Sequence, residues 1–325
     1  MSVVQFQPVP TMNYKPISVE ALKRYALANR TGKVSVSELG LPHTAGQSFA
    51  DFIRNLPGFL AAHDFREIVR SITKARSNGR PVILGMGAHP IKVGLSPIII
   101  DLMKRDIITA LACNGACIIH DFELAYAGQT SEDVAKELNA GTFGMALETG
   151  QHLNHAISSG VAAGLGIGRS VGAYIAASGF SCRDKSIFGA AAELDIPATV
   201  HVAIGADIIH MHPEADGAAI GQGSMLDFRL FTSVVADLEG GVYINLGSAV
   251  ILPEVFLKAL TVARNLGNRV DGFTTVNMDF VQHYRPRENV LRRPTAVNGR
   301  NFALTGHHEI MFPLLAATVL EEIAQ

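Results

Sequence analysis

The stretch that decides the fold is Gly241-Val-Tyr-Ile-Asn-Leu-Gly-Ser-Ala-Val-Ile-Leu-Pro-Glu254. It predicts a buried strand over Val242–Leu246, a turn at Gly247 and Ser248, and a helix from Pro253, because proline is favoured at the first helical position. A strand, a small-residue turn and a helix N-terminus can together bind an anion or a cofactor. The same spacing fits an ordinary tight turn of an α/β fold, so the stretch by itself leaves both interpretations open.

Length and composition narrow the class of protein. The chain has 325 residues, 48% of them hydrophobic and 17% charged, which is enough for one large domain or two small ones. A net charge of -2 gives no basic footprint for nucleic acid. No apolar run approaches the roughly 20 residues of a membrane helix, and the first residues do not have the pattern of a signal peptide. Three cysteines, an odd number, fit a reducing cytosol. We therefore expect a cytoplasmic protein with a small-molecule substrate and with no nucleic-acid or membrane partner.

Short apolar strands alternate with helical segments along most of the chain. The predicted strands are Val82–Met86, Ile107–Cys113, Ala198–Ala203, Asp207–Met211, Val242–Leu246 and Gly272–Asn277. This alternation predicts an α/β fold with a mostly parallel sheet that is covered by helices on both faces. We expect residues 1–57 to form an N-terminal extension with short helices, one of them over Val19–Asn29. Residues 58–325 are then expected to form a single α/β domain.

Ligands of such sheets bind at the carboxyl ends of the strands. Five segments at predicted strand ends collect most of the glycine, histidine and acidic turn residues: Gly85–Gly94, Asn114–Asp121, His210–Gly221, Gly247–Leu252 and Thr305–Glu309. The first of them, which contains Gly87 and Lys92, follows a strand and precedes a helix, as a phosphate-binding loop does. It is neither a P-loop nor a GxGxxG motif. A loop whose Lys92 points to water is the alternative.

Histidines and carboxylates gather at two of these ends. His210-Met-His212 is followed by Glu214 and Asp216, and a second group is His307-His308-Glu309. These side chains are of the types that bind a divalent metal. A candidate metal set is His210, His212, Asp216, His307 and His308. The spacing is not HExxH, and the alternative is a set of histidines that form hydrogen bonds around a polar ligand.

Two further segments contain candidate catalytic or ligand-binding residues. His120 lies beside Asp121 and Glu123, so it is a candidate for acid–base work, although Asp121 can equally serve as a helix cap. The run Arg285–Pro294 is basic and bounded by prolines, so Arg285 and Arg287 are candidates for clamping an anionic ligand. A solvated loop is the alternative for that run.

In the order of its segments the chain resembles the deoxyhypusine synthase family. The resemblance rests on the Gly-rich loop, Leu102–Gly115, Ile196–Val200 with Asp216-Gly217, the stretch from Gly241, and Met311–Val319. It spans roughly residue 60 to the C-terminus. It implies a Rossmann-like fold, a homotetramer with sites between subunits, and bound NAD. The family's reaction oxidises spermidine, holds its aminobutyl group on an enzyme lysine as an imine, and transfers that group to an acceptor amine.

The resemblance also implies a set of cofactor-binding residues. Asp216 and Gly217 match a step of the family at the NAD site. Asn114 and Gly115 stand at a small turn against the cofactor, and Gly247 and Ser248 stand in a glycine run near the nicotinamide. Gly87 belongs to the Gly-rich loop, and His307 stands where the family has an aspartate for the cofactor.

The residues that carry out the family's reaction are missing from this sequence. Ile251 occupies the position of the nucleophilic lysine, and Leu252 that of the neighbouring histidine. An imine needs an amine. The chain has no tryptophan for a polyamine pocket, and the matching loop is basic. True deoxyhypusine or homospermidine synthesis would need a replacement nucleophile such as Lys92, and the sequence argues against it.

The sequence therefore supports an NAD-binding enzyme of transferase or oxidoreductase type that acts on a small, anionic substrate without a lysine imine. The candidate catalytic residues are Lys92, His120, His210 and His212. The alternatives are a metal-dependent hydrolase or lyase on the same fold, with a divalent ion as cofactor, and a non-catalytic homo-oligomeric binding protein.

Overall fold

The computed structural model describes residues 13–324. These residues divide into two compact units, one that ends at Leu39 and one that begins at Gly40. The division lies earlier than the predicted boundary at residue 57, because the helix α1 (Phe49–Arg54) buries Ile53 in the core of the second unit. The first unit contains the 3-10 turns η1 (Leu27–Asn29) and η2 (Val36–Glu38). The helix predicted over Val19–Asn29 is wrong, since its residues are exposed and no packing stabilises a helix there.

The second unit is built on one sheet. Its strands are β1 (Val82–Met86), β2 (Ala110–Asn114), β3 (Ala198–His201), β4 (Val242–Leu246), β5 (Thr274–Asp279) and β6 (Arg300–Thr305). All neighbouring pairs are parallel, in the order β3-β2-β1-β4-β5-β6. The register pairs Gly85 with Asn245 and Met86 with Leu246 across β1 and β4. This is the order of a Rossmann-type sheet, as predicted.

The helices follow the strands in alternation. After α1 they are α2 (Leu60–Ser77), α3 (His89–Lys92), α4 (Ser96–Lys104), α5 (Gly115–Ala127), α6 (Val134–Ala140), α7 (Leu147–Ala162), α8 (Ile167–Ala177), α9 (Ile187–Glu193), α10 (Gly217–Ala236), α11 (Ile251–Asn265), α12 (Tyr284–Pro286) and α13 (His308–Ile323). Shorter turns are η3 (Arg183–Lys185), η4 (Ile208–Met211) and the π-helix η5 (Arg287–Arg292). Among residues 13–324 no single helix can span a membrane by length and composition, and one bent pair, α7 with α8, meets the test only jointly.

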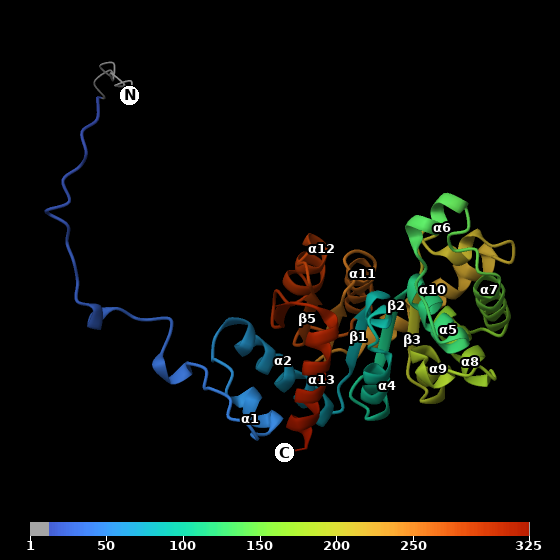
Figure 1. Ribbon diagram of the computed structural model, residues 1–325, viewed down its shortest axis with the longest axis horizontal. Helices are drawn as coiled ribbons and strands as arrows, with labels where there is room; N and C mark the ends of the chain where they lie inside the picture. The colour runs from blue at the N-terminus through green and yellow to red at the C-terminus, as the bar shows by residue number, and fades with distance from the viewer. Residues whose placement is uncertain (1–12, 325) are drawn as a thin grey trace, which may run out of the picture. The chain divides into compact units, whose positions relative to one another are not determined.

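Two hydrophobic cores cover the two faces of the sheet. On one face Leu84 and Ile244 pack against α2, α4, α5 and α13. On the other face Ile83 and Tyr243 pack against α10, α11 and η5. Neighbouring residues of a strand point to opposite faces, so these strands are apolar along their whole length. Figure 1 shows α2 and α13 side by side against the sheet.

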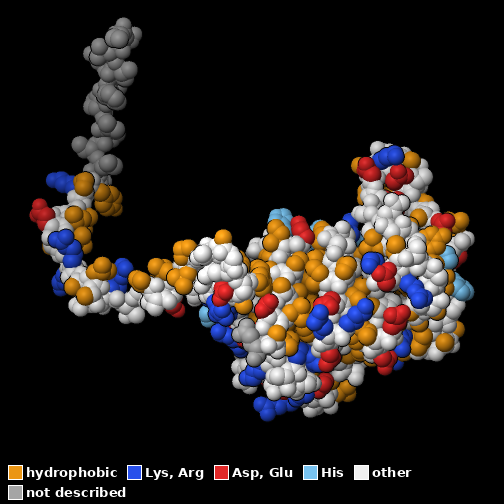
Figure 2. Space-filling view, turned by 60° about the horizontal axis from the view of Figure 1, so that its bottom comes forward, with side chains coloured by type: hydrophobic (Ala, Val, Ile, Leu, Met, Phe, Trp, Pro, Cys, Tyr) orange, Lys and Arg blue, Asp and Glu red, His pale blue; other side chains and the backbone are white. Residues whose placement is uncertain are grey.

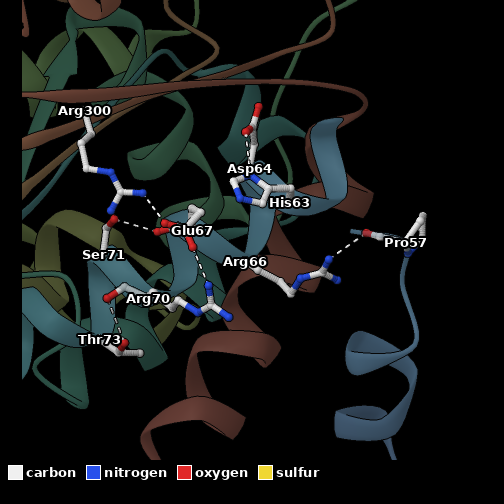
Figure 3. A network of polar contacts seen from close by, with 9 residues as sticks. All are labelled: Pro57, His63, Asp64, Arg66, Glu67, Arg70, Ser71, Thr73 and Arg300. Atoms are coloured by element: carbon white, nitrogen blue, oxygen red, sulfur yellow. Dashed lines mark hydrogen bonds and ion pairs between the residues drawn. The ribbon is translucent and has the colours of Figure 1, made fainter. Parts of the chain in front are cut away.

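The edge of the sheet at β6 is held by polar contacts (Figure 3). Glu67 on α2 accepts hydrogen bonds from Arg70 and from Arg300 of β6. Arg66 donates to the carbonyl oxygens of Leu56 at 3.1 Å and Pro57 at 2.7 Å, just beyond α1. These contacts hold α2 against β6 on one side and against the segment that follows α1 on the other. Figure 2 shows acidic and basic side chains interspersed over one face of the molecule, without an extended patch of one charge there.

Several predicted elements differ from the structure. The strand predicted at Asp207–Met211 is wrong: the segment forms η4, because a short apolar run does not by itself distinguish strand from helix. The turn predicted at Asn114-Gly115 is wrong too, since α5 starts at Gly115 directly after β2. The basic run predicted as a loop forms α12 and η5. The run of β6 is missing from the predicted strands, although Thr305–Glu309 is expected to follow a strand, because an edge strand with mostly exposed side chains lacks an apolar run.

Candidate functional site at the carboxyl edge of the sheet

The strand order reverses between β1 and β4. The helices that follow these two strands leave on opposite faces: α4 follows β1 and packs in one core, and α11 follows β4 and packs in the other. A crevice outside the carboxyl ends of the strands forms at such a reversal, and it is the usual ligand site of open α/β sheets. The strand order and this rule together place the candidate site, which we call the crevice, beside Gly87 and Gly247.

Two glycines form the floor of this crevice with their backbones. The N–H of Gly87 donates to the carbonyl oxygen of Leu246 at 3.2 Å. A Cβ atom at Gly87 would lie 2.7 Å from the carbonyl oxygen of Gly247, which is closer than side chains approach. Gly247 has a φ of +65°, in the left-handed region that favours glycine. The segments that follow β1 and β4 therefore bring their backbones into close contact at Gly87 and Gly247.

The helix N-termini around the crevice differ in how they are capped. No side chain caps the first turn of α5, which begins at Gly115 after Asn114. At α11, Ser248 Oγ accepts a hydrogen bond from the Leu252 N–H at 3.2 Å. At α10, Asp216 Oδ1 accepts from the N–H groups of Ala218 and Ala219, at 2.8 and 3.2 Å. Of α5, α10 and α11, α5 is the helix whose first turn no side chain caps, and an uncapped helix N-terminus attracts anions.

A buried carboxylate lies above the start of α5. A Cβ atom at Gly115 would lie 2.1 Å from Oδ2 of Asp207. That oxygen is buried and has no hydrogen-bond partner within residues 13–324, and the same holds for Nε2 of the nearby His210. Burial raises the pKa of Asp207, while His210 opposes the rise. The Asp207 carboxyl group has free hydrogen-bonding capacity that a bound ligand can use.

The remaining catalytic candidates lie in two other places. His120 on α5 forms a hydrogen bond with Thr130 at 2.7 Å, and Thr130 donates to Glu123. Burial, and secondly the charge of Lys92, lower the pKa of His120 to about 4, so the ring is neutral at pH 7. His212 is buried, and its Nε2 forms a hydrogen bond with the Gly144 carbonyl oxygen at 2.8 Å, which holds the loop before α7.

Other candidates already have partners. His307 is exposed, and its Nδ1 lies 3.8 Å from Glu309 Oε1. Arg285 Nε lies 3.4 Å from Glu254 Oε1, whereas Arg287 is exposed on η5. In the part of the chain that the structure describes, no three His, Cys, Asp or Glu side chains come together to hold a metal ion. The set His210, His212, Asp216, His307 and His308 therefore does not form a metal site.

A group of side chains, of which the sequence analysis singled out His308 alone, lies at the carboxyl ends of β5 and β6. The rings of His89, Phe280 and His308 lie with their centroids 5.3 to 6.0 Å apart. Asp279 Oδ1 lies 3.7 Å from His308 Nε2. We name these four residues the ring cluster. Asp279 and Phe280 end β5 directly, so the rule that ligands bind at carboxyl strand ends could have found them.

The fold and this crevice define a Rossmann-like α/β protein with its candidate site at the strand-order reversal. No protein-family model and no curated protein matches the chain. Among solved structures, a putative deoxyhypusine synthase from Entamoeba histolytica has a TM-score of 0.51 at 12% identity, over 87% of this chain and 96% of that chain. The ternary complex of AgrE with ornithine and NAD+ has a TM-score of 0.52 at 14% identity, over 80% of this chain and 33% of that chain.

A putative LOR/SDH protein from Methanococcus maripaludis is also similar, with a TM-score of 0.48 at 16% identity, over 86% of this chain and 72% of that chain. The chain spans about a third of the length of AgrE and of the cyanobacterial arginine dihydrolase ArgZ. These comparisons show distant structural similarity to deoxyhypusine synthase and to AgrE-like Rossmann-fold proteins. At such identities they show the fold alone.

Proposed function

We propose that the protein is an enzyme that binds NAD, or a related dinucleotide, in the crevice between β1 and β4 and acts on a small substrate. The observation that carries this proposal is the uncapped first turn of α5, which begins where β2 ends, beside the carboxyl end of β1 that leads into the close approach of Gly87 to Gly247. A pyrophosphate carries the charge that a helix N-terminus attracts, and it needs a close backbone approach. The AgrE complex, which has this fold, contains NAD+.

The residues present fit the parts of a dinucleotide. The N–H groups of the first turn of α5 would hold the pyrophosphate. The free Oδ2 of Asp207 would accept a hydrogen bond from a ribose hydroxyl group, as acidic residues of Rossmann sites do. Asp216, by contrast, is used by the first turn of α10 as its cap. When bound, the dinucleotide supplies hydride chemistry, and the protein supplies orientation and proton transfer.

The start of α11 has no lysine that could form an imine. Ile251 is half-buried, and Leu252 is fully buried in the core against α10 and η5. The nearest lysine on that helix, Lys258, is paired with Glu254. The proposed reaction therefore proceeds without an amine nucleophile at this place.

We also propose a homotetramer. Its support is a set of exposed apolar side chains near the carboxyl edge, which are Val250, Val281, Tyr284 and Ile310. Exposed apolar area of this kind is typical of protein interfaces. Native mass spectrometry would report the subunit number and any bound dinucleotide together, and a monomeric species alone would contradict the proposal.

The substitution Ala116→Asp tests the dinucleotide site. Ala116 is the second residue of α5, so a carboxylate there would occupy the proposed phosphate position. We expect the affinity for NAD+ to fall about tenfold in isothermal titration calorimetry. We expect the free energy of unfolding to stay equal or rise by about 0.3–1 kcal/mol, because an acidic residue favours a helix N-terminus.

The matched control is Ala135→Asp, which places the same carboxylate at the second residue of α6. It should leave the NAD+ affinity unchanged. If neither the oxidised nor the reduced dinucleotides bind the native protein, the proposed function is wrong. If both variants bind NAD+ as well as the native protein does, the site is not at α5.

A further inference from the structure

His308 is the most deeply buried unpaired imidazole of the crevice. The residue is 1% exposed, and neither ring nitrogen makes a hydrogen bond of ordinary geometry among residues 13–324, although the backbone of Met278 lies close enough to raise the pKa of the ring. A buried polar group without a partner costs free energy, so its persistence calls for an explanation such as a catalytic role. The ring stands at the start of α13, behind His89 and Phe280.

The orientation of the ring points toward the crevice. A Cβ atom at Gly247 would lie 2.6 Å from His308 Cε1 and 3.3 Å from each ring nitrogen. The edge of the imidazole that carries both nitrogens therefore faces the turn after β4. The absence of a side chain at Gly247 leaves room for this edge.

Asp279 faces one of the two nitrogens. Its Oδ1 lies 3.7 Å from His308 Nε2, and the residue is 4% exposed. The same oxygen accepts the Phe280 N–H at 2.8 Å, which fixes the carboxylate. A distance of 3.7 Å is slightly longer than a hydrogen bond, and such contacts often tighten when a ligand binds. A carboxylate at Nε2 favours the tautomer with the proton there and leaves Nδ1 as a proton acceptor.

The exposed side chains of the ring cluster, His89 and Phe280, cover His308. Phe280 is 52% exposed and His89 is exposed, and both rings lie within 6.0 Å of the His308 ring by centroid. Exposed side chains change rotamer easily, whereas Asp279 and His308 are held by packing. A path to His308 would require rotamer changes of His89 and Phe280, the two exposed rings that lie against it.

We propose that His308, oriented by Asp279, is the proton acceptor of the reaction, and that the substrate carries a CH–OH or CH–NH2 group. This inference rests on the proposed function. When bound, the oxidised dinucleotide would supply the acceptor for the hydride that the C–H bond of the substrate gives up. The O–H or N–H bond breaks, its electrons form the C=O or C=N bond, and its proton goes to His308 Nδ1. The imidazolium that results is stabilised by the Asp279 carboxylate.

The charges around His308 are consistent with this role. The titratable groups beside it are Asp279 on β5, His89 on α3, and Glu309 on its own helix, while β4 presents Gly247, which has no side chain. Burial is the largest influence and lowers the pKa of His308; Asp279 and Glu309 act in the opposite direction. The ring is thus neutral at neutral pH and able to accept a proton.

A binding experiment tests the proposal without a known substrate. Protonated His308 would repel the positively charged nicotinamide ring of NAD+ but not the neutral ring of NADH. We expect the ratio of the dissociation constants, NAD+ over NADH, to rise about tenfold as the pH falls through the pKa of His308. His308→Gln should abolish this rise, because glutamine does not titrate. Asp279→Asn should shift it to lower pH, because the carboxylate favours the imidazolium.

His63→Gln is the matched control, since His63 is an exposed histidine of α2 remote from the crevice. It should leave the rise intact. If the dinucleotides bind but the rise persists in His308→Gln, the role of His308 is wrong and the proposed function stands. A rise that is unchanged in Asp279→Asn contradicts the role of Asp279. If no dinucleotide binds, both the inference and the proposed function are wrong.

Discussion

Replacement of Asp227 by alanine is expected to lower the free energy of unfolding by about 3 kcal/mol or more. Asp227 lies on α10 and is 1% exposed. Its Oδ2 accepts the N–H of Gly168, in the first turn of α8, at 3.0 Å and the N–H of Val200, on β3, at 2.8 Å. Alanine would leave both N–H groups buried without a partner. Each such loss costs about 1–3 kcal/mol, and a cavity adds to it.

The substitution Asp227→Asn separates the effect of the hydrogen bonds on stability from the effect of the titrating charge. Burial raises the pKa of Asp227 from 3.8 to about 7, against the pull of its hydrogen bonds. The folded protein therefore holds this proton more tightly than the unfolded chain does. Its stabilising contribution is complete below about pH 4 and is lost as the pH rises to about 7. Asparagine keeps an oxygen acceptor and does not titrate.

Urea denaturation between about pH 4 and about pH 8 would measure both effects. The free energy of unfolding of the native protein should fall more with rising pH than that of Asp227→Asn. Asp121, another buried carboxyl group whose pKa burial raises to about 6, is present in both proteins, so the difference reports Asp227. Equal pH profiles, or an alanine variant as stable as the native protein, would contradict this account.

The sequence predicts the sheet well because its central strands are uniformly apolar. Val82–Met86 and Val242–Leu246 are strands with the predicted bounds, since both faces of each are buried. The edge strand β6 is not predicted, because exposed positions in Arg300–Thr305 carry polar residues without cost. The role of Asp227 is not predictable either: it sits within α10 and pairs with backbone groups of α8 and β3, which are remote along the chain.

The candidate site was predictable only in part. Asn114 ends its strand, Gly87, Gly115, Gly247 and Ser248 follow theirs, and the parallel sheet brings these segments to one edge. The sequence cannot show that Asp216 caps α10 or that His212 binds the carbonyl of Gly144, because those partners depend on tertiary packing. Nor does it show that Asp279 and His308 meet, since β5 and α13 come together only through β6. Whether the predicted residues bind a cofactor stays a prediction.

Gly87→Ala is expected to destabilise the protein by about 1–3 kcal/mol and to weaken NAD+ binding by about tenfold or more. The added methyl group would lie 2.7 Å from the Gly247 carbonyl oxygen, with further Gly247 and Ser248 backbone atoms within 3.9 Å. Backbone atoms cannot turn aside as a side chain can. The turns after β1 and β4 would have to separate, which deforms the floor of the crevice. Chemical denaturation and calorimetric titration with NAD+ would measure the two effects.

The same substitution at Gly221 is the control, and its expected sign is opposite. Gly221 is exposed within α10, and a Cβ atom there meets nothing within 4 Å. Alanine favours a helix over glycine by about 1 kcal/mol, so Gly221→Ala should raise the free energy of unfolding and leave binding unchanged. If Gly87→Ala is as stable as the native protein and binds NAD+ equally well, the close backbone approach is not required. If it is destabilised yet binds normally, the glycine serves only the packing of β1 against β4, and the cofactor lies elsewhere along the carboxyl edge.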